Sequence, residues 1–277
     1  MEGKLYLVAT PIGNLEDITL RAIRVLKEAD IIVAEDVRHT LKLLNHLQIV
    51  KPLISFHRHS SKEKSEEILN HLKAGKDIAL VSDAGTPIIS DPGEEIVKKA
   101  IENNITVIPI PGACACISGL ICSGLDAKEF IFIGFLPQNK KLRKQKLEEI
   151  QKANKTTILY EAPHKILETL QDLENVTETR KIVIAREMTK IHEEILRGTA
   201  NELIEKLNSP KGEMVLLIEK NEFILSEEEQ SILTLNNLSL QEHYEYYKKL
   251  GHEKKEIIKK IAKDRKVSKD DIYKNFI

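Results

Sequence analysis

The sequence alternates between short apolar runs rich in valine and isoleucine and longer segments whose apolar residues recur at helical spacing. The apolar runs are LYLVA, IIVA, IALVS, ITVIPI and FIFIG. The segments between them include LRAIRVLKEAD and EEIVKKAIENN, in which apolar residues three and four positions apart would line one face of a helix. Strands that alternate with helices form βαβ units around a parallel sheet. We therefore expect an α/β protein whose N-terminal part is a mostly parallel sheet with flanking helices.

The alternation of strand and helix patterns is interrupted once and later ends, and these two points divide the chain of 277 residues into three parts. It pauses at Gly134 and Pro137, before a charged helical segment. A second set of strand and helix patterns follows, TTILYE, HKILETLQDL, KIVIARE, EEILRG and GEMVLLIE, from which we expect a second α/β lobe with a mixed sheet. Beyond it the strand signals end. We place an N-terminal lobe at 1–135, a second lobe at 136–222 and a small, basic helical C-terminal segment at 223–277.

Composition excludes several classes of protein. The formal net charge is −1, so a nucleic-acid or membrane partner has to be argued from local clusters of charge. No apolar run approaches the roughly 20 residues that a membrane span requires, and the first residues do not resemble a signal peptide. The three cysteines, Cys114, Cys116 and Cys122, have no second pair or histidines at metal-ligand spacing. We expect a cytoplasmic protein with no membrane span and no metal site.

The segment SDAGTPIISDPG, residues 82–93, follows a buried apolar run and is rich in glycine, proline and aspartate. In open α/β sheets the ligand crevice lies beyond the carboxyl ends of the strands, where such a loop would be. Part of the segment has a structural interpretation, with Asp91 as the N-cap of the next helix and Pro92 as its first residue. Capping does not account for Asp83, Gly85 and Thr86, which a binding site would explain.

Two other loops resemble this one. Pro11 and Gly13 follow the first strand, and PIPGACACISG follows the fifth, with the small residues 113–115 at the start of a helix. Small residues there would admit a flat ligand, although tight packing of helix on sheet explains them almost as well. The chain contains neither the GxGxxG fingerprint of dinucleotide sites nor the GxxxxGK[ST] phosphate loop. Three such loops on one sheet predict a single pocket.

Eight motifs stand in an order that resembles a known family. They are VATPIGNLEDIT, AEDVRHT, SFHRHS, VSDAGTPIISDPG, IPIPGACA, GFLP, YEAPH and AREMTKIHEE. Together, over about residues 4–220, they resemble the tetrapyrrole methylase superfamily, and most closely its group of small-subunit ribosomal RNA methyltransferases. The resemblance implies a two-lobed α/β protein that binds S-adenosylmethionine between its lobes. It also implies 2'-O-methylation of the ribose of a cytidine in the decoding centre of 16S rRNA, and a homodimer.

Carried over by position, the resemblance implies a set of residues that bind the methyl donor, largely through backbone groups. They are Pro11, Asp83, Ala84, Gly85, Thr86, Ile89, Ala113, Cys114, Ala115, Tyr160, Glu161, Ala185, Arg186 and Gly212. A purely structural reading of YEAPH has Pro163 as the first residue of a helix; it leaves Tyr160 and Glu161 unexplained.

A ribose hydroxyl is a poor nucleophile until its proton leaves, so a base or a cation is expected near it. We rank Glu187 first as the base, with Lys190 or Arg186 stabilising charge. The other candidates are Glu35, Asp36, Arg38, His57 and His59. A charged pair at a strand end is more often a structural or solvated ion pair, and this interpretation stays open for Glu187.

Two basic clusters are candidates for contact with RNA phosphates, one at residues 140–146 and one in the C-terminal segment, where Ser268 is expected to cap the last helix. The predicted RNA-binding residues are Arg38, His57, Lys140, Lys141, Arg143, Lys144, Lys259, Lys260, Lys263 and Arg265. Solvated helix faces would give the same pattern. Two other functions remain open at this point: C-methylation of a corrin precursor, and a non-catalytic RNA-binding role in ribosome assembly.

Overall fold

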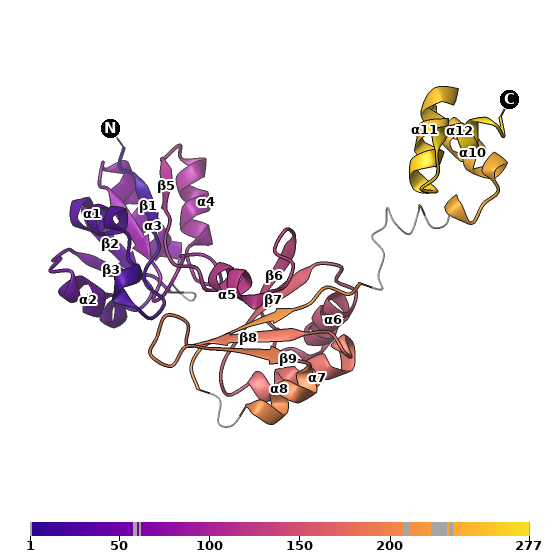
Figure 1. Ribbon diagram of the computed structural model, residues 1–277. Helices are drawn as coiled ribbons and strands as arrows, with labels where there is room; N and C mark the ends of the chain where they lie inside the picture. The colour runs from indigo at the N-terminus through magenta and orange to yellow at the C-terminus, as the bar shows by residue number, and fades with distance from the viewer. Residues whose placement is uncertain are drawn as a thin grey trace. The chain divides into compact units, whose positions relative to one another are not determined.

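The computed structural model describes residues 2–57, 60, 62–207, 211–222, 232 and 235–276. The chain forms two compact units, Met1–Lys220 and Asn221–Ile277. The larger unit contains two five-stranded sheets, and the smaller unit is helical (Figure 1). This arrangement confirms the predicted α/β class, with a parallel sheet, a second lobe with a mixed sheet, and C-terminal helices.

The first sheet is parallel throughout and has the strand order β3-β2-β4-β1-β5. Its strands are β1 (Leu5–Val8), β2 (Ile31–Ala34), β3 (Leu53–Ser55), β4 (Ile78–Val81) and β5 (Val107–Ile110). Its helices are η1 (Leu15–Asp17), α1 (Leu20–Glu28), α2 (Val37–His46), α3 (Lys62–Lys73) and α4 (Glu94–Glu102). Side chains of α3 and α4 pack on one face of the sheet, and those of α1 and α2 pack on the other. Because both faces are covered, β2 and β4 are buried along their whole length, which explains why they read as continuous apolar runs.

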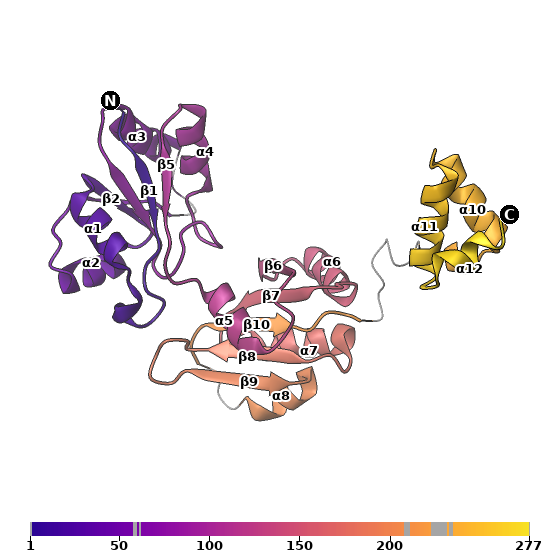
Figure 2. The ribbon, with the colours of Figure 1, turned by 45° about the horizontal axis from the view of Figure 1, so that its top comes forward.

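The second sheet is mixed, with the order β6-β7-β10-β8-β9, in which only the pair β6 and β7 is parallel. Its strands are β6 (Phe130–Phe135), β7 (Thr156–Glu161), β8 (Ile182–Arg186), β9 (Glu194–Gly198) and β10 (Met214–Ile218). One face is covered by α6 (Lys140–Gln151), α7 (Ile166–Thr177) and α8 (Ala200–Lys206). The other face carries α5 (Ala115–Ser123), which Figure 2 shows lying against this sheet.

The strand at 130–135 belongs to the second sheet, although the sequence placed it at the end of the first lobe. Phe130–Phe135 pairs in parallel with β7, and α5, which precedes it, packs through Cys116 and Leu120 on the same sheet. Gly134, taken as the start of a linker, has a φ of +74° and lies at a register shift within the strand. The glycine therefore marks a β-bulge, which has the same local signature as a turn.

The C-terminal unit contains α10 (Leu240–Lys249), α11 (Lys254–Asp264) and α12 (Lys269–Tyr273) around a small apolar core. The Ser268 side chain accepts a hydrogen bond from the backbone N–H of Asp271, which confirms it as the cap of the last helix. The predicted start of this segment, at Phe223, lies outside the described residues.

A buried polar cluster joins the helices of this unit. The imidazole of His243 is fully buried, with Nε2 3.3 Å from Oδ2 of Asp264, and Nε of Arg265 donates to its Nδ1 over 3.3 Å. The hydroxyl of Tyr247 donates to the same Asp264 oxygen over 2.6 Å. Burial, and then the charge of Arg265, lower the pKa of His243 below its usual value.

Mild acidification is expected to destabilise the C-terminal unit. The pKa of His243 is lower in the folded state than in the unfolded chain, where it is about 6.5. As the pH falls towards 6.5, the histidine is therefore protonated in the unfolded chain before it is protonated in the folded protein. The contribution of neutral His243 to the free energy of unfolding is therefore complete above about pH 6.5. Below that pH the free energy of unfolding falls, by at most about 1.4 kcal/mol per pH unit. Hydrogen exchange of residues 240–273 in the full chain, corrected for intrinsic rates, should show this loss between pH 7.5 and 6. If the His243→Gln variant lost the same amount of protection over this pH range, the effect could not be assigned to His243.

Candidate functional site

A cavity of about 540 Å³ is lined by loops that follow strands of both sheets, together with the start of α5 and of β10. This volume lies within the range of about 300–1,000 Å³ that is usual for small-molecule sites. Nine of the fourteen predicted donor-binding residues line it: Asp83, Ala84, Gly85, Thr86, Ile89, Cys114, Ala115, Tyr160 and Glu161. The two predicted catalytic residues, Glu187 and Lys190, line it as well.

The three glycine- and proline-rich loops of the first sheet are tied to one another. Thr10 and Gly85 exchange two backbone hydrogen bonds of 2.9 and 3.0 Å, which form an isolated antiparallel bridge. Gly85 has a φ of +82°, and a Cβ there would lie 3.2 Å from Cγ2 of Ile12. The hydroxyl of Thr86 donates to the carbonyl of Ala113 over 3.0 Å. These contacts place the first, fourth and fifth strand ends around one cavity.

The loop that follows β4 does not contain the predicted helix cap. The first residue of α4 is Glu94, and its N-cap is Gly93, with a φ of +133° and no side-chain cap, so Asp91 and Pro92 precede the helix. A Cβ on Gly93 would approach Cδ2 of Leu80 to 2.8 Å, so the loop packs directly on its own strand. Asp91 instead lines the cavity, a placement that the cap pattern did not indicate.

Four non-glycine residues in the two loops beside the cavity have positive φ: Ile88 and Ser90 after β4, and Glu187 and Thr189 after β8. Such conformations cost about 1–3 kcal/mol each and persist only where the surroundings impose them. Backbone strain of this kind concentrates at binding sites. The two loops are therefore held in one conformation by their packing, which preforms the cavity wall.

Tyr160 and Glu161 end β7 and have different roles. The Tyr160 hydroxyl accepts a hydrogen bond of 3.1 Å from the backbone N–H of Cys116, and its ring lies edge-on to Phe132 and Phe135. Burial raises the pKa of Tyr160, so the phenol stays neutral. Its hydroxyl and ring thus join the sheet to the first turn of α5.

The Glu161 carboxylate is buried and used within the fold. Oε1 accepts from the backbone N–H of Ala162 over 2.8 Å, and Oε2 accepts from the Thr169 hydroxyl over 2.6 Å. These bonds hold the turn between β7 and α7. The first residue of α7 is Ile166, so the alternative structural interpretation of YEAPH, in which Pro163 begins the helix, is wrong. Glu161 orders the wall of the cavity mainly through this turn.

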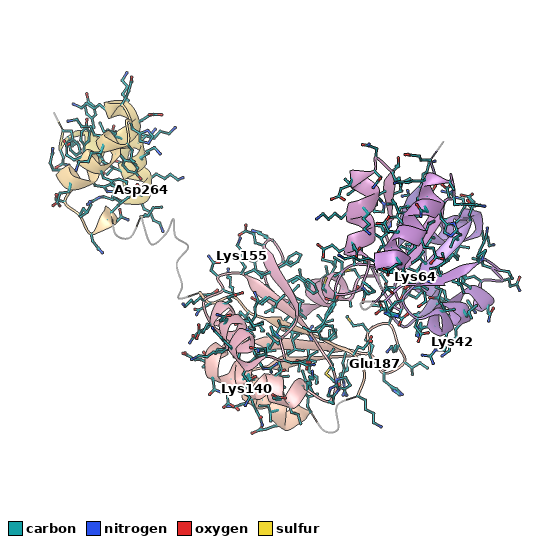
Figure 3. The ribbon with its side chains drawn as sticks, turned by 180° about the vertical axis from the view of Figure 1, so that it is seen from behind. Lys42, Lys64, Lys140, Lys155, Glu187 and Asp264 are labelled. Carbon is teal, nitrogen blue, oxygen red and sulfur yellow. The ribbon has the colours of Figure 1, made fainter. Side chains whose placement is uncertain are left out.

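Glu187 and Lys190 form an ion pair, with 2.8 Å between Oε1 and Nζ, in the loop that follows β8. Figure 3 labels Glu187 in this loop. Two glycines make room for the pair. A Cβ on Gly212 would lie 2.0 Å from Oε1 of Glu187, and a Cβ on Gly13 would lie 2.5 Å from Cγ of Lys190. Gly13 belongs to the loop after β1, so this loop of the first sheet packs directly on the loop after β8.

The other predicted donor residues, Pro11, Ala113, Ala185, Arg186 and Gly212, are not part of the lining. Ala185 is buried within β8, and Arg186 forms an ion pair with Glu194 across the strand pair, with 2.5 Å between Nε and Oε2. Ala113 supports the site through its carbonyl and Gly212 through the space it leaves for Glu187. A sequence motif thus includes residues such as Ala185 and Arg186, whose side chains contact the rest of the protein and do not line the cavity.

The lining also contains residues that were not predicted to form the site: Ile12, Ser90, Asp91, Phe135, Ala162, Pro163, His164, Met188, Glu213, Met214 and Val215. Phe135 and His164 lie within the motifs GFLP and YEAPH, which could have indicated them. Six lining residues are carboxylates: Glu35, Asp83, Asp91, Glu161, Glu187 and Glu213. Among the described residues, Lys190 is the one Lys or Arg in the lining, so the cavity favours a positively charged ligand.

The predicted RNA-binding residues lie outside the cavity lining. Lys140, Lys141 and Lys144 are exposed on α6, as are Lys259 and Lys263 on α11 (Figure 3 labels Lys140). His57 is exposed, and His59 lies outside the described residues. Solvent exposure leaves these lysines and His57 accessible to a phosphate backbone.

Five members of the predicted RNA set have partners within the protein. Lys144 makes the weakest contact, with its Nζ 4.0 Å from Oε1 of Glu148, and stays 79% exposed. Arg143 donates to Oδ2 of Asp172 over 2.6 Å and to the Thr169 hydroxyl, so this guanidinium joins α6 to α7. Arg265 donates to His243 and to the Leu238 carbonyl. Lys260 lies 5.3 Å from the centre of the Tyr247 ring, and Arg38 pairs with Asp36 while remaining 89% exposed. Arg143 and Arg265 therefore have structural roles that the charge pattern did not reveal.

The part of the chain that the structure describes holds no group of three or more His, Cys, Asp or Glu side chains placed to bind a metal ion. In the same residues, no helix combines the length and apolar character needed to cross a lipid bilayer.

Comparisons with known proteins agree with this arrangement. The profile of the family described as Tetrapyrrole (Corrin/Porphyrin) Methylases matches residues 4–204. The chain is 50% identical over 274 residues to ribosomal RNA small subunit methyltransferase I of Halalkalibacterium halodurans, covering 98% of this chain and 94% of that protein. It is 47% identical to the protein of the same name in Bacillus subtilis, with coverages of 98% and 93%.

Solved structures share the fold at low sequence identity. The uroporphyrin-III C-methyltransferase of Thermus thermophilus in complex with S-adenyl homocysteine superposes with a TM-score of 0.56 at 18% identity, covering 78% of this chain and 97% of that one. A diphthine synthase superposes with a TM-score of 0.60 at 16% identity, with coverages of 78% and 90%.

Proposed function

The chain belongs to the tetrapyrrole methylase family and, within it, to the ribosomal RNA small subunit methyltransferase I group, and from this membership we propose that it methylates 16S rRNA with S-adenosylmethionine as the donor. The target is the ribose 2'-hydroxyl of a cytidine in the decoding centre, and the enzyme acts in the cytoplasm. The observation that carries the proposal is near-full-length identity of about half to relatives of that name, in a chain in which loops of both lobes line an acidic cavity.

The cavity fits a donor of this kind. Its volume suits a ligand of nucleoside size, its carboxylates favour a cation, and Tyr160 and Phe135 contribute aromatic surface to the wall. S-Adenosylmethionine supplies a methyl group on a positively charged sulfur. Backbone groups of the loop from Asp83 to Thr86 are expected to hold its uncharged parts, because the bridge to Thr10 fixes that loop.

Glu187 accepts the proton of the attacking hydroxyl in this proposal. Its carboxylate lines the cavity, and Lys190 fixes one of its oxygens at 2.8 Å. The same ammonium group stabilises negative charge near the ribose oxygen. Positioning of the two reactants supplies most of the remaining acceleration, for which the preformed loops are suited.

The test of the function is to incubate the protein with labelled donor and, separately, 30S particles, free 16S rRNA and DNA, and then to map the label. We expect label on a single ribose of 16S rRNA, in one of the two RNA samples. Label on a base would overturn the proposal. Intact donor binding without label on any RNA would instead favour a non-catalytic assembly role.

Exposed lysines of α6 are proposed to contact rRNA phosphates. Replacing Lys140, Lys141 and Lys144 by glutamine is expected to weaken RNA binding at low salt by at least tenfold. If about five phosphates are neutralised, log affinity falls with log salt at a slope of roughly −4, and the triple variant should flatten it by about 2 to 3. Filter binding across a salt series measures both effects.

A matched variant separates local contact from net charge. Lys27, Lys76 and Lys98 are exposed lysines of the first lobe that belong to neither basic cluster. Their replacement by glutamine changes the net charge equally and should leave the slope within about 0.5 of its original value. An equal flattening in both triple variants would show that α6 makes no particular contact.

We also propose that the chain forms a homodimer, as the family resemblance implies. The outer face of α5 supports this, because Ile117 and Ile121 are 42% and 77% exposed there on a helix otherwise packed on the second sheet. Replacing Ile121 by glutamate is expected to shift the protein from dimer to monomer in sedimentation experiments. A monomeric unmodified protein at micromolar concentration would contradict the proposal.

A further inference from the structure

Cys114 and Cys116 form a pair of thiols at the wall of the cavity. Cys114 is the N-cap of α5 and lines the cavity, and Cys116, two residues on, is buried. Their Sγ atoms are 3.4 Å apart, and both cysteines are free thiols. The third cysteine, Cys122, is exposed on the same helix, and its Sγ lies 3.1 Å from the carbonyl of Ser118.

The pair is chemically asymmetric. A hydrogen bond from the Cys116 thiol lowers the pKa of Cys114 to about 6, with a further hydrogen bond from the backbone of Ile117 in the first turn of α5. The same interaction, with burial, raises the pKa of Cys116. At neutral pH Cys114 is therefore mostly the thiolate, which is the reactive form of cysteine, and Cys116 is its neutral partner.

We propose that Cys114 and Cys116 are an oxidation site, at which a hydroperoxide converts the pair to an intramolecular disulfide. The Cys114 sulfur attacks a peroxide oxygen, the O–O bond breaks, and the leaving oxygen takes a proton to become water or an alcohol. Cys114 is then a sulfenic acid. The Cys116 sulfur attacks the sulfenic sulfur, an S–S bond forms as the S–O bond breaks, and the hydroxide leaves as water with the proton of the Cys116 thiol. The two thiols lose two electrons, and the peroxide is reduced by two.

The geometry links this bond to the cavity. A disulfide requires an S–S distance of about 2.05 Å, so the sulfurs must approach by more than 1 Å. That movement draws the Cys114 side chain off the wall and disturbs the first turn of α5, where the Cys116 N–H donates to the Tyr160 hydroxyl over 3.1 Å. If the proposed function holds, on which this consequence rests, the oxidised protein binds the methyl donor at least tenfold more weakly, and dithiothreitol restores binding.

The site is tested on the full chain with hydrogen peroxide, followed by iodoacetamide and peptide mass analysis. We expect Cys114 and Cys116 to become protected together while Cys122 stays alkylated, and Cys122→Ser to behave identically. In Cys116→Ser the reaction should stop at a Cys114 sulfenic acid, which dimedone traps. Continued alkylation of both cysteines after peroxide that oxidises glutathione in the same tube overturns the proposal, as does faster oxidation of Cys122.

A second measurement does not involve the donor. Between pH 7 and 8.5, alkylation of a thiol of ordinary acidity rises about fifteenfold, whereas alkylation of Cys114 should change less than twofold. Calorimetry with S-adenosylmethionine on reduced and oxidised protein then separates the two proposals. A disulfide that forms in a protein that never binds the donor refutes the proposed function and leaves the oxidation site standing.

Discussion

Replacing Gly212 by alanine is expected to lower methyl transfer at least about 100-fold while leaving the protein folded. The new Cβ would lie 2.0 to 2.5 Å from Oε1, Cδ and Cγ of Glu187, so the whole Glu187 side chain must leave its place beside Lys190. A displacement of about 1 Å of a reacting group is enough for such a loss. Turnover of labelled donor on 16S rRNA measures the rate, and a thermal melt measures stability.

Gly124 provides the matched control for this substitution. Its φ of +80° is close to the +78° of Gly212, and a Cβ there would meet nothing within 4 Å. Both alanine variants should lose about 1–2 kcal/mol of stability from the left-handed conformation, because that cost does not depend on the neighbours. Gly124→Ala should keep its activity. Equal activity losses in the two variants would assign the effect to backbone strain and remove Glu187 from the explanation.

Replacing Glu187 by glutamine is expected to lower kcat by about 10²- to 10⁴-fold, the usual contribution of a general base. Glutamine has nearly the same shape, and its side-chain oxygen still accepts from Lys190, so donor binding by calorimetry should change less than about threefold. The residual rate should rise with pH, because hydroxide replaces the missing base. Full turnover in this variant with normal donor binding would eliminate Glu187 from the chemistry.

Glu213→Gln removes the same charge from the cavity at another position. Glu213 lines the cavity, and its backbone carbonyl accepts a hydrogen bond from the backbone N–H of Glu187 over 3.3 Å. If Glu187 acts only by attracting the cationic donor, the two variants should weaken donor binding alike and share a pH profile. A fall in kcat confined to Glu187→Gln assigns proton transfer to that carboxylate.

The fold and the cavity were largely predictable because their signals are local. Buried strands read as apolar runs, and glycine and proline where the strands end indicated three loops, which the bridge between Thr10 and Gly85 and the bond from Thr86 to Ala113 bring together. The membership of the strand at 130–135 was not predictable in this way. Its pairing with β7 depends on tertiary contacts that a local sequence pattern does not record. In the sequence, the glycine of a β-bulge cannot be distinguished from the glycine of a linker.

The destinations of individual side chains were less accessible to sequence reasoning. Arg143 and Arg265 lie in stretches of sequence that are typical of a basic surface cluster. Each is nevertheless held by a hydrogen bond to a residue distant in the sequence, Arg143 to Asp172 and Arg265 to His243. Ile88 has a positive φ, which β-branched residues disfavour, so no sequence pattern predicts this conformation. The path of the loop before α4, and with it the residue at which α4 begins, therefore could not be predicted from the cap pattern. Such positions are decided by packing that no local pattern records.

The crossover between the sheets contributes Cys114 and Ala115 to the wall of the cavity. Strand β5 ends in the first sheet at Ile110, helix α5 packs on the second sheet from Ala115, and the chain passes between the two sheets only here among the described elements. Any rotation of one sheet against the other must therefore be absorbed within these few residues, which include Cys114 in the cavity wall. A ligand that contacts Cys114 is therefore expected to restrict rotation between the sheets, and such rotation is expected to affect how long the ligand stays bound.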